Sequence, residues 1–437
     1  MLFAVGIAVF VLGLLVSIAL HEVGHMVPAK RFGVRVSQYM VGFGPTLWSR
    51  TKGETEYGLK AIPLGGYVRL IGMYPTAEAV DAKPRVGRIA EIVESAREAS
   101  AAEIRPGEDH RAFYRLSAPK KLVVMLGGPV MNLVLALVLF GIAFVGIGVA
   151  AATTTVGALS DCAQTSAAEE CAADAPVAPA KAAGMQLGDS IVAFDGVEVS
   201  SWAQLAAAIQ ENGAQTVTVV VERDGERVPL ELTTALVERA AFGPDGEPIV
   251  DPAGEPVTEQ VGFLGVTPTA ERQPMAIGEV GSMFATASWE TVKVVFTLPV
   301  KLFDLVRVTF GDGERDQSSV IGIVGVGRIA GEAASLPAEG IGIAERAVVM
   351  LSLLASLNLA LFAFNLIPLV PLDGGHVVGA LWEGAKRQLA RLRGAAVPRP
   401  ADTARMAPLA YAVFIVLAGM GLLLIYADLV RPVSITG

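Results

Sequence analysis

The residues best suited to catalysis lie near the N-terminus, in the segment HEVGH that runs from His21 to His25. In an α-helix this spacing places both imidazoles on one face, where they can bind one metal ion, and lets Glu22 hold a water molecule beside it. Zinc-dependent hydrolysis needs this combination of groups. Because a motif with three fixed positions also arises by chance, the surrounding sequence has to support the prediction.

An apolar segment directly precedes this motif. Residues 1–20 contain no charged side chain, and a helix of that length, at about 1.5 Å per residue, matches the roughly 30 Å hydrocarbon layer of a membrane. Ionisable groups at the end of such a helix are costly unless they are functional, and two histidines with one glutamate are best explained by a divalent cation. We therefore predict a zinc site, with Zn2+ as the cofactor, at the end of a membrane helix.

A catalytic zinc site needs a third protein ligand and leaves a further position for water. The chain has four histidines, and the two outside the motif are His110, in a polar segment, and His376. The candidate third ligand is Asp373, in the segment NLIPLVPLDGGH. Residues that interrupt a helix surround it, namely Pro368, Pro371, Gly374 and Gly375. Inside a membrane, an interrupted helix is tolerated only where the chain lines a protein cavity. The alternative, which composition alone favours, makes Asp373 a turn residue in an Asp-Gly-Gly corner.

The composition indicates a membrane protein. Of 437 residues, 53% are hydrophobic and 18% are charged, which is too apolar for an average soluble protein. Four runs lack charge over about twenty residues or more, the length that crosses a bilayer; they are 1–20, 122–160 (only partly membrane), 347–372 and 406–427. Any one run could be a buried core helix. Together they predict a polytopic α-helical membrane protein with four transmembrane helices. Because no basic residue precedes the first run, we expect a helix that is retained and not a cleaved signal peptide.

Charge then orients the helices, because cytoplasmic loops retain Lys and Arg. Residues 28–121 carry 16 basic and 10 acidic side chains, and the short loop 374–405 is also basic. Residues 151–345 carry 28 acidic and 10 basic side chains. We therefore expect both termini and one large acidic domain outside the cytoplasm, in a multi-pass protein of the plasma (inner) membrane. The net charge of −9 arises in that outer domain, and no basic patch indicates a nucleic-acid partner.

The predicted domain plan follows from these boundaries. The four transmembrane helices are the first, with HEVGH (1–27), the second (120–150), the third, which ends in Asp373 (346–373), and the fourth (406–430). Two cytoplasmic loops join them (28–119 and 374–405), and the first loop contains a membrane-associated β-hairpin region (34–72) and a helix at 88–102. Outside the cytoplasm we expect an α+β domain with insertions (151–270), followed by an amphipathic helix and linker (271–345). Within the outer domain, we expect loose insertions at 158–180 and 243–259 and a final strand at 261–267.

Residues 289–310 are apolar enough to suggest a fifth membrane helix. Polar side chains recur there at three- and four-residue steps, however, and form one stripe: Glu290, Lys293, Thr297, Lys301, Asp304 and Arg307. This pattern is typical of a helix on the membrane surface, bent at Pro299. Packing against the outer domain is the alternative, and the sequence does not separate the two.

Three polar or small-residue features add detail. Gly127 and Gly128 in the second membrane helix let a neighbouring backbone approach closely, and Asn132 in the same helix needs a polar partner. Both cysteines, Cys162 and Cys171, fall in the outer segment. An oxidising compartment permits a disulfide, whereas the Ala- and Ser-rich flanks suit two free thiols in a loose loop.

The sequence resembles the site-2 protease family of intramembrane zinc metalloproteases, in particular the regulator-of-sigma-E protease group in its single-PDZ actinobacterial form. The shared features, in chain order, are HEVGH, Gly42-Phe43-Gly44, Gly128-Pro129-Val130-Met131-Asn132, the segment from Lys181 to Asp189 with Asp195-Gly196, and Asn365…Pro368…Asp373-Gly374. The resemblance covers most of the chain. Better-known members carry two tandem PDZ domains, whereas only one is marked here, as an extracytoplasmic α+β PDZ-like domain.

The resemblance implies a zinc metalloendopeptidase. It implies that His21, His25 and Asp373 ligate zinc and that Glu22 is the base, which reverses the preference for a turn at Asp373. The residues it places near the substrate or its oxyanion are Asn365, Gly42, Phe43, Gly44 and Asn132. The expected substrates are transmembrane segments of single-span proteins, with pre-cleaved anti-sigma factors of a stress response as partners alongside the lipid bilayer.

The hairpin at residues 36–70 has two possible roles. A substrate helix is internally hydrogen-bonded and must be unwound before cleavage, and the hairpin could hold the unwound segment extended by strand addition. The alternative is a structural hairpin that plugs the helix bundle. A membrane scaffold with a structural metal and a PDZ domain that binds peptide tails is the competing function, but it does not explain Glu22. A zinc peptidase facing the solvent would require HEVGH to lie outside the bilayer.

Overall fold

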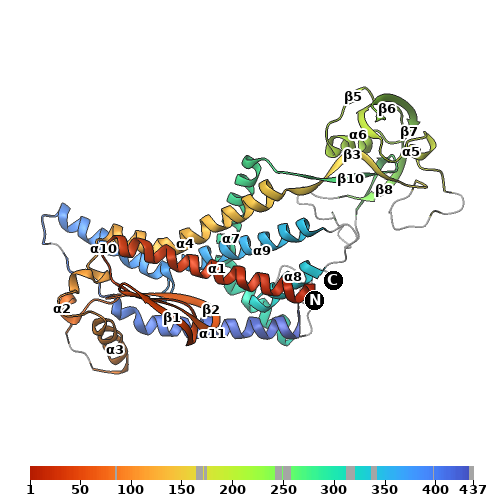
Figure 1. Ribbon diagram of the computed structural model, residues 1–437. Helices are drawn as coiled ribbons and strands as arrows, with labels where there is room; N and C mark the ends of the chain where they lie inside the picture. Colours follow the sequence, from red (N-terminus) through yellow and green to blue (C-terminus); the bar gives the residue numbers. More distant parts are fainter. Residues whose placement is uncertain are drawn as a thin grey trace. The chain divides into compact units, whose positions relative to one another are not determined.

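The computed structural model describes residues 1–83, 86–163, 171, 175–241, 249, 257–311, 320–335, 342–396 and 398–432. The chain forms two compact units (Figure 1). One consists of Met1–Gly148 with Pro274–Gly437, and the other of Val149–Gln273. The second unit agrees closely with the predicted outer segment 151–270. Of the insertions expected at 158–180 and 243–259, residues 164–170, 172–174, 243–248 and 250–256 lie outside the described residues.

Four helices in the described part of the chain are long and apolar enough to cross a membrane. They are α1 (Leu2–Arg31), α4 (Ala118–Phe140) continued by the π-helical turn η3 (Gly141–Ile147), α9 (Ile343–Asn365), and α11 (Ala407–Val430) with the 3-10 turn η4 (Thr403–Met406) before it. Each matches one predicted charge-free run. The run 122–160 is helical only as far as Ile147, as expected, and α1 continues past its expected end at residue 27 because Pro28 removes only one helical hydrogen bond.

Glycines bring α1 and α4 into direct backbone contact, side by side in Figure 1. A Cβ atom built on Gly24 would lie 2.2 Å from the carbonyl oxygen of Gly127, and one on Gly127 would lie 2.0 Å from that of Gly24. Both distances are impossible for real side chains, so this crossing requires glycine in both helices. The close approach predicted from the small residues of the second helix is confirmed.

The predicted β-hairpin is present beside α1, with β1 at Val36–Lys52 and β2 at Thr55–Leu70. Its register folds the two long strands into a small sheet, because the first half of β1 pairs with both halves of β2: Tyr39 is opposite both Val68 and Tyr57. Gly42 and Gly44 have φ values of 93° and 79°, which lets β1 bend between its halves. The last part of β2, from residue 62 to Leu70, is therefore an edge of this sheet.

Short helices join the hairpin to α4. They are α2 (Ala77–Val80), α3 (Arg88–Ala102), η1 (Asp109–Arg111) and η2 (Phe113–Arg115). The helix predicted at 88–102 is confirmed with the same bounds. In the core beneath these elements, Val36 and Leu70 of the hairpin pack with Phe113 and Val124. This packing fixes the hairpin against the N-terminal half of α4.

Two helices follow the second unit, α7 (Ile277–Phe310) and α8 (Ile323–Ser335). α7 includes the polar stripe predicted at 289–310 and is not among the four candidate spans. Its Val280 packs with Phe140 of α4 and Leu359 of α9. α8 was not predicted, because its glycine-rich sequence is a poor helix former; those small residues pack against α1, where a Cβ on Gly6 would lie 2.5 Å from the carbonyl oxygen of Ala330.

The predicted third helix, 346–373, is wrong at its C-terminal end. α9 ends at Asn365, and Asp373 is instead the first residue of a separate helix, α10 (Asp373–Leu392), which occupies most of the expected loop 374–405. Pro368 and Pro371 lack the amide hydrogens that would continue α9, whereas an acidic residue in the first turn favours a new helix. The break therefore places Asp373 at a helix start rather than inside a span.

The second unit is built on a six-stranded sheet with β10-β3-β4-β6-β7 in order and β5 paired with β4, plus the separate hairpin β8-β9. Its elements are β3 (Val149–Leu159), α5 (Pro179–Ala182), β4 (Ser190–Phe194), β5 (Val197–Glu198), α6 (Trp202–Glu211), β6 (Thr216–Arg223), β7 (Glu226–Thr233), β8 (Ala235–Ala240), β9 (Thr258–Phe263) and β10 (Val266–Gln273). The single strand expected at 261–267 is two strands, because Gly265, with φ of 87°, turns the chain between them.

The interior of the second unit is apolar. Ile191, Phe194, Leu205 and Val219 are at its centre. Cys162 and Cys171 form a disulfide, which decides between the two alternatives left open by the sequence. This unit thus has the ordinary construction of a small α+β domain.

Candidate active site

Three side chains that are distant in sequence bring one ligand atom each to a common point. The Nε2 atoms of His21 and His25 are 3.2 Å apart, and Oδ2 of Asp373 lies 3.4 Å and 3.3 Å from them. Zinc–ligand bonds of roughly 2.0–2.1 Å in a tetrahedron require ligand atoms about 3.3–3.4 Å apart. Among the described residues, this is the group of histidine and acidic side chains that could hold a metal ion.

The ring of His25 is fixed by a hydrogen bond on its far side. Its Nδ1 lies 2.7 Å from the carbonyl oxygen of Val124 in α4. A carbonyl can only accept, so Nδ1 carries the hydrogen and Nε2 presents a lone pair to the cluster. This tautomer is the one that metal ligation through Nε2 requires.

The ring of His21 is also held from α4. The side-chain amide of Asn132 lies 3.1 Å from Nδ1 of His21. Asn132 is completely buried, and its Oδ1 has no hydrogen-bond partner among the described residues. This burial and contact favour a role in holding the His21 ring over the predicted contact with substrate.

Gly128 leaves the space that the two imidazoles occupy. A Cβ atom on Gly128 would lie 2.2 Å from Nε2 of His25 and 2.7 Å from Cε1 of His21. Any side chain here would therefore displace the ligand atoms themselves. The glycine pair of α4 serves both the helix crossing and the cluster.

Asp373 is delivered to the cluster by the proline-containing break between α9 and α10. Burial alone would raise the pKa of Asp373, but its contacts with the two imidazoles outweigh burial and lower that pKa. The carboxylate is therefore anionic, and its Oδ2 has no hydrogen-bond partner among the described residues. A buried carboxylate oxygen in this position is suited to a cation.

Glu22 lies between the cluster of His21, His25 and Asp373 and the edge of the hairpin sheet. A Cβ atom on Gly66 of β2 would come within 3.2 Å of Cγ of Glu22, and the backbone amide of Val68 faces the same carboxyl group. Nearby, the Tyr39 hydroxyl donates a 2.8 Å hydrogen bond to the carbonyl oxygen of Ala19. Burial, with the Glu22 charge adding to it, raises the pKa of Tyr39 to about 12, so the phenol stays neutral and ties β1 to α1.

The remaining predicted site residues lie around this centre. Phe43 is 43% exposed, faces Ile62 across the sheet and stacks on Tyr67 with the ring centroids 6.3 Å apart. Asn365 is the last residue of α9, partly exposed, at the start of the break that leads to Asp373. Gly42 and Gly44 shape the bend of β1. The predicted contacts of these residues with substrate stay predictions.

The two other histidines are outside the cluster. His110 is exposed, with Nδ1 3.1 Å from the carbonyl oxygen of Gly107. His376 lies in the first turn of α10, where burial lowers its pKa and keeps the imidazole neutral. Neither one competes with Asp373 as the third member of the cluster.

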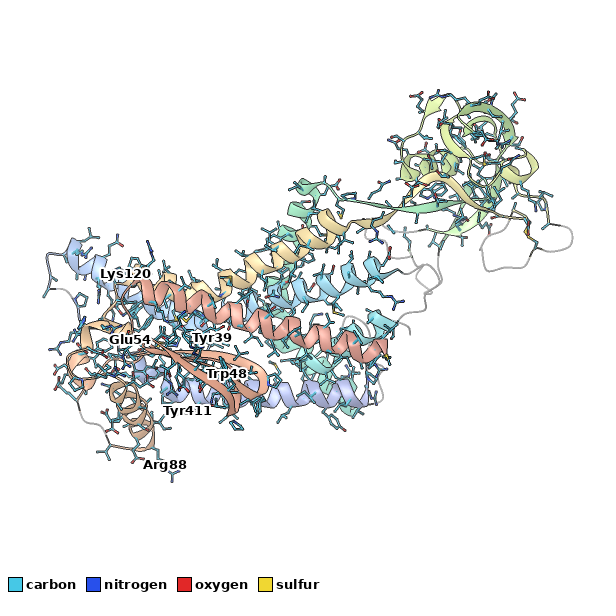
Figure 2. All side chains as sticks on the ribbon, in the orientation of Figure 1. Tyr39, Trp48, Glu54, Arg88, Lys120 and Tyr411 are labelled. Atoms are coloured by element: carbon cyan, nitrogen blue, oxygen red, sulfur yellow. A yellow bond between two sulfur atoms is a disulfide. The ribbon has the colours of Figure 1, made fainter. Side chains whose placement is uncertain are left out.

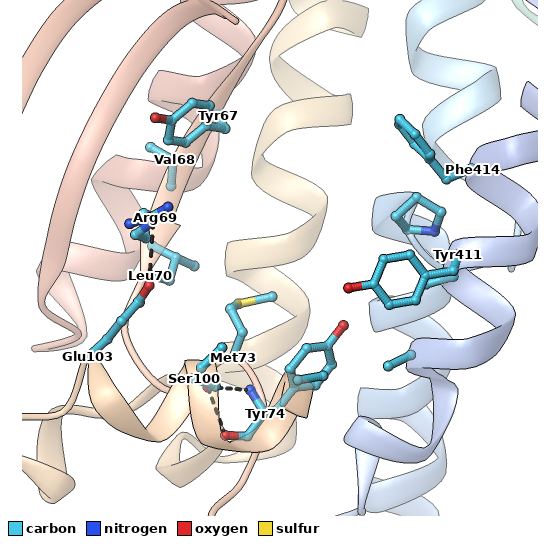
Figure 3. Close-up of a pocket in the computed structure, with 15 residues that line it drawn as sticks. Tyr67, Val68, Arg69, Leu70, Met73, Tyr74, Ser100, Glu103, Tyr411 and Phe414 are labelled. Atoms are coloured by element: carbon cyan, nitrogen blue, oxygen red, sulfur yellow. Dashed lines mark hydrogen bonds and ion pairs between the residues drawn. The ribbon is translucent and has the colours of Figure 1, made fainter. Parts of the chain in front are cut away.

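A cavity of about 600 Å³ opens beside the edge of β2 (Figure 3). Its walls come from β2, α3 and α11, with Pro371 contributed by the break before Asp373. Val68, Tyr411 and Phe414 make it largely apolar, and Figure 3 shows an ion pair between Arg69 and Glu103 at 3.4 Å along one side. Burial raises the pKa of Glu103, partly offset by Arg69. An extended edge strand therefore borders an apolar cavity close to Glu22.

Sequence reasoning missed the groups that support the cluster. The carbonyl of Val124 and the amide of Val68 belong to the backbone, so no side-chain pattern marks them. Tyr39 carried no local signal. Gly128 was recognised as a small residue in a helix, and only the structure shows that it makes room for the histidines.

Comparison with known proteins agrees with this geometry. The model of peptidase family M50 matches residues 9–404. Zinc metalloprotease Rip1 of Mycobacterium tuberculosis is 34% identical, with all of both chains covered. Zinc metalloprotease Rip1 of Mycolicibacterium smegmatis is also 34% identical over the whole of both chains. Metalloprotease MmpA of Caulobacter vibrioides is 30% identical over 87% of this chain and 86% of its own. The chain therefore belongs to peptidase family M50 and is a zinc metalloprotease of the membrane.

Proposed function

We propose that this protein cleaves peptide bonds within transmembrane segments, with zinc held by His21, His25 and Asp373 and with Glu22 as the catalytic base. The observation that carries the proposal is the position of the ligand triangle. Its three atoms meet at the side of α1, a helix apolar enough to cross a membrane. A peptide bond reaches such a site only if the substrate lies in or at the bilayer.

The protein's own groups prepare this chemistry. A bound zinc ion supplies Lewis acidity, which polarises a peptide carbonyl and makes water nucleophilic near neutral pH. The carbonyl of Val124 keeps the proton of His25 on Nδ1, away from the ligand atom. An amide can turn by 180°, so Asn132 can accept the Nδ1 hydrogen of His21 through its otherwise unpartnered Oδ1. The Glu22 carboxylate takes the proton from water and returns it to the leaving amine.

The edge of the hairpin sheet supports strand addition as the mode of substrate binding. Among the described residues, the segment of β2 from residue 62 to Leu70 pairs with a strand on one side only, and it passes Glu22 at Gly66 and Val68. An unwound substrate could pair with this edge, which replaces the hydrogen bonds lost from its helix. The apolar cavity of Figure 3 would then receive substrate side chains. Asn365 and the segment from Gly42 to Gly44 would contact the same stretch.

The finer assignment of topology and substrate rests on charge and resemblance. The basic loops and the acidic segment 151–345 support cytoplasmic loops with both termini and a PDZ-like domain outside. The disulfide between Cys162 and Cys171 fits that placement, because oxidising compartments lie outside the cytoplasm. Single-span anti-sigma factors, shortened by another protease, are the proposed substrates.

Two substitutions test the assignment. Purified Glu22→Gln should lose cleavage of a single-span protein by at least about 100-fold, since a general base contributes that much, and should keep its zinc. Asp373→Ala should lose both cleavage and zinc, because two histidines are too few ligands for a stable site. Elemental analysis measures the metal.

The control is Glu54→Gln, since Glu54 is an exposed residue at the hairpin turn (Figure 2) that pairs with Arg111 away from the cluster. It should change neither cleavage nor zinc. If Glu22→Gln still cuts at an appreciable fraction of the normal rate, Glu22 is not the base. If the unmutated protein binds zinc but cuts no membrane segment, the competing function as a membrane scaffold with a structural metal is favoured.

A further inference from the structure

A second cavity, of about 660 Å³, lies between α3 and the residues that precede α11. Its lining includes Lys83, Ile89, Val93, Arg97, Asp402 and Arg405, and it shares no lining residue with the cavity of Figure 3. The proposed peptidase function gives this cavity no role.

The strongest feature of this cavity is a buried cation with unused hydrogen-bond donors. Arg97 is 3% exposed, yet its Nε and Nη1 have no hydrogen-bond partner among the described residues. Only Nη2 is bonded, to Oδ1 of Asp402 at 2.9 Å. Glu94 also pairs with Arg97, but its Oε2 is 3.8 Å from Nε, too far for a hydrogen bond. Leaving charged donors unsatisfied is costly, so the guanidinium is prepared for an anion with several oxygens.

The charges around Arg97 favour such an anion. Asp402 is shared, because Arg405 also donates to its Oδ2 at 2.8 Å. With Lys83, the described residues that line the cavity include three cations, against the two carboxylates of Glu94 and Asp402. The net charge of these side chains is positive, and a phosphate group would balance it.

An apolar track leads to the guanidinium. Ile89, Val93 and Arg97 follow one another at four-residue steps on α3, so they line one face of the helix. Ile89 is 70% exposed. A ligand that matches this face has a phosphate at one end and an alkyl chain at the other.

The position of the cavity indicates where such a ligand comes from. The candidate span that contains α11 begins at Thr403, between Asp402 and Arg405. Basic pockets at the ends of membrane helices bind the head groups of anionic lipids. We propose that this cavity binds an anionic phospholipid, with its phosphate on Arg97, Arg405 and Lys83 and an acyl chain along Ile89 and Val93.

A bound lipid would connect two walls of the substrate cavity. Arg97 belongs to α3 and Arg405 to the turn that starts α11, and these two helices also line the cavity of Figure 3. A phosphate between the two arginines would hold the helices together. The lipid is thus expected to act at the side of the site where we place substrate.

Native mass spectrometry of the full-length protein in detergent tests the proposal without measuring catalysis. Dioleoylphosphatidylglycerol should be retained, and dioleoylphosphatidylcholine should not. Arg405→Gln and Lys83→Gln should each weaken phosphatidylglycerol binding about fivefold, the value expected for one basic residue at an anionic lipid. Arg97→Gln should weaken it most. Because Arg97 also pairs with Asp402, the exposed Arg405 and Lys83 keep the test valid if that variant does not fold.

The matched control is Arg88→Gln. Arg88 is an exposed basic residue of α3 (Figure 2) that does not line the cavity, so its loss should leave lipid binding unchanged. Equal retention of the two lipids, or equal loss in the Arg88 and Arg405 variants, would overturn the proposal. Inorganic phosphate that displaces phosphatidylglycerol at equimolar concentration would show that the cavity recognises a free anion and not a lipid.

Discussion

The two units treat their buried polar groups differently. In the second unit, the buried Asp189 is fully used: Arg223 donates to both carboxylate oxygens, at 2.8 and 2.7 Å, and the amide of Gln186 donates to Oδ2. In the first unit, Oδ2 of Asp373 and Oδ1 of Asn132 are buried without a hydrogen-bond partner among the described residues. Complete satisfaction is typical of structural polar groups, whereas unsatisfied atoms that lie beside two imidazoles, as these do, indicate a place for a ligand.

Glycines turn the backbone and permit close approaches in both units, but those beside the cluster have a further role. In the second unit, Gly265 lets the backbone turn between two strands. In the first, Gly24, Gly127 and Gly128 remove side chains so that two helices and two imidazoles can meet. Substitutions beside the cluster of His21, His25 and Asp373 should therefore affect metal and catalysis, and those in the second unit should affect only its own stability.

The largest effect is expected from Gly128→Ala. The added methyl group would lie 2.2 Å from Nε2 of His25, so both imidazoles must move away from the metal position. Cleavage should fall to background and zinc should be lost, although no ligand is changed. Gly141→Ala is the control, because a Cβ there meets nothing within 4 Å. Normal zinc content in Gly128→Ala would show that the histidines do not occupy this position in the working enzyme.

A smaller effect is expected from Asn132→Ala. Loss of a group that orients a ligand imidazole typically reduces metal affinity or activity by about 10–100-fold. Asn358→Ala is a matched control, since Asn358 is another buried asparagine of the helical unit but bonds to Ser17 and the backbone of Leu354. If both variants lose the same activity, Asn132 contributes to packing alone.

The sequence predicts the side chains at the centre of the site better than the groups that support them. HEVGH and Asp373, the proposed ligands, are visible because metal ligands must have particular side chains at particular spacings. The groups that orient these side chains are harder to find. Val124 acts through its backbone carbonyl, which any residue at that position would also provide. The start of α10 at Asp373 depends on how prolines divide a long apolar run, and the run itself shows no boundary.

The fold likewise has elements that the sequence predicts and elements that it does not. The four apolar helices follow from charge-free runs, because a membrane requires that composition. α8 could not be predicted from hydropathy or propensity. Its glycines argue against a helix in isolation, whereas Gly331 becomes favourable where α1 packs against it, since a Cβ there would lie 2.7 Å from the ring of Phe3. The sequence predicts one strand where the second unit ends in two, because Leu264 continues the apolar pattern through the turn.

In the second unit, Arg223→Gln should lower stability without changing zinc. The substitution leaves the carboxylate of Asp189, which is 1% exposed, without its charged partner, and an unpaired buried charge is destabilising. The bond from Arg223 lowers the pKa of Asp189 below its ordinary 3.8, so the stabilisation is present above about pH 4 and is lost as pH falls through the lower folded value. Thermal unfolding followed between pH 7 and pH 3 checks this. A variant that unfolds at lower temperature yet shows the same acid dependence as the wild type would separate Asp189 from the pH effect.

The smallest effect is expected from removing the second unit altogether. Val149 of β3 and Gln273 of β10 are directly paired, so the two ends of the unit are neighbours and residues 150–272 can be replaced by a short glycine-serine linker. The metal cluster found in the described residues lies wholly in the other unit. Zinc content and cleavage of a shortened substrate should therefore stay within about twofold of normal, the range of a surface change of ~0.4 kcal/mol. If the unit acts as a filter on substrate size, the same protein should also cut an untrimmed substrate that the complete enzyme rejects. Matched long and short versions of one single-span protein measure both. An equal loss of rate on the two versions would mean that the second unit recruits substrate or supports the helices, and the contrast between a catalytic and a non-catalytic unit would fail.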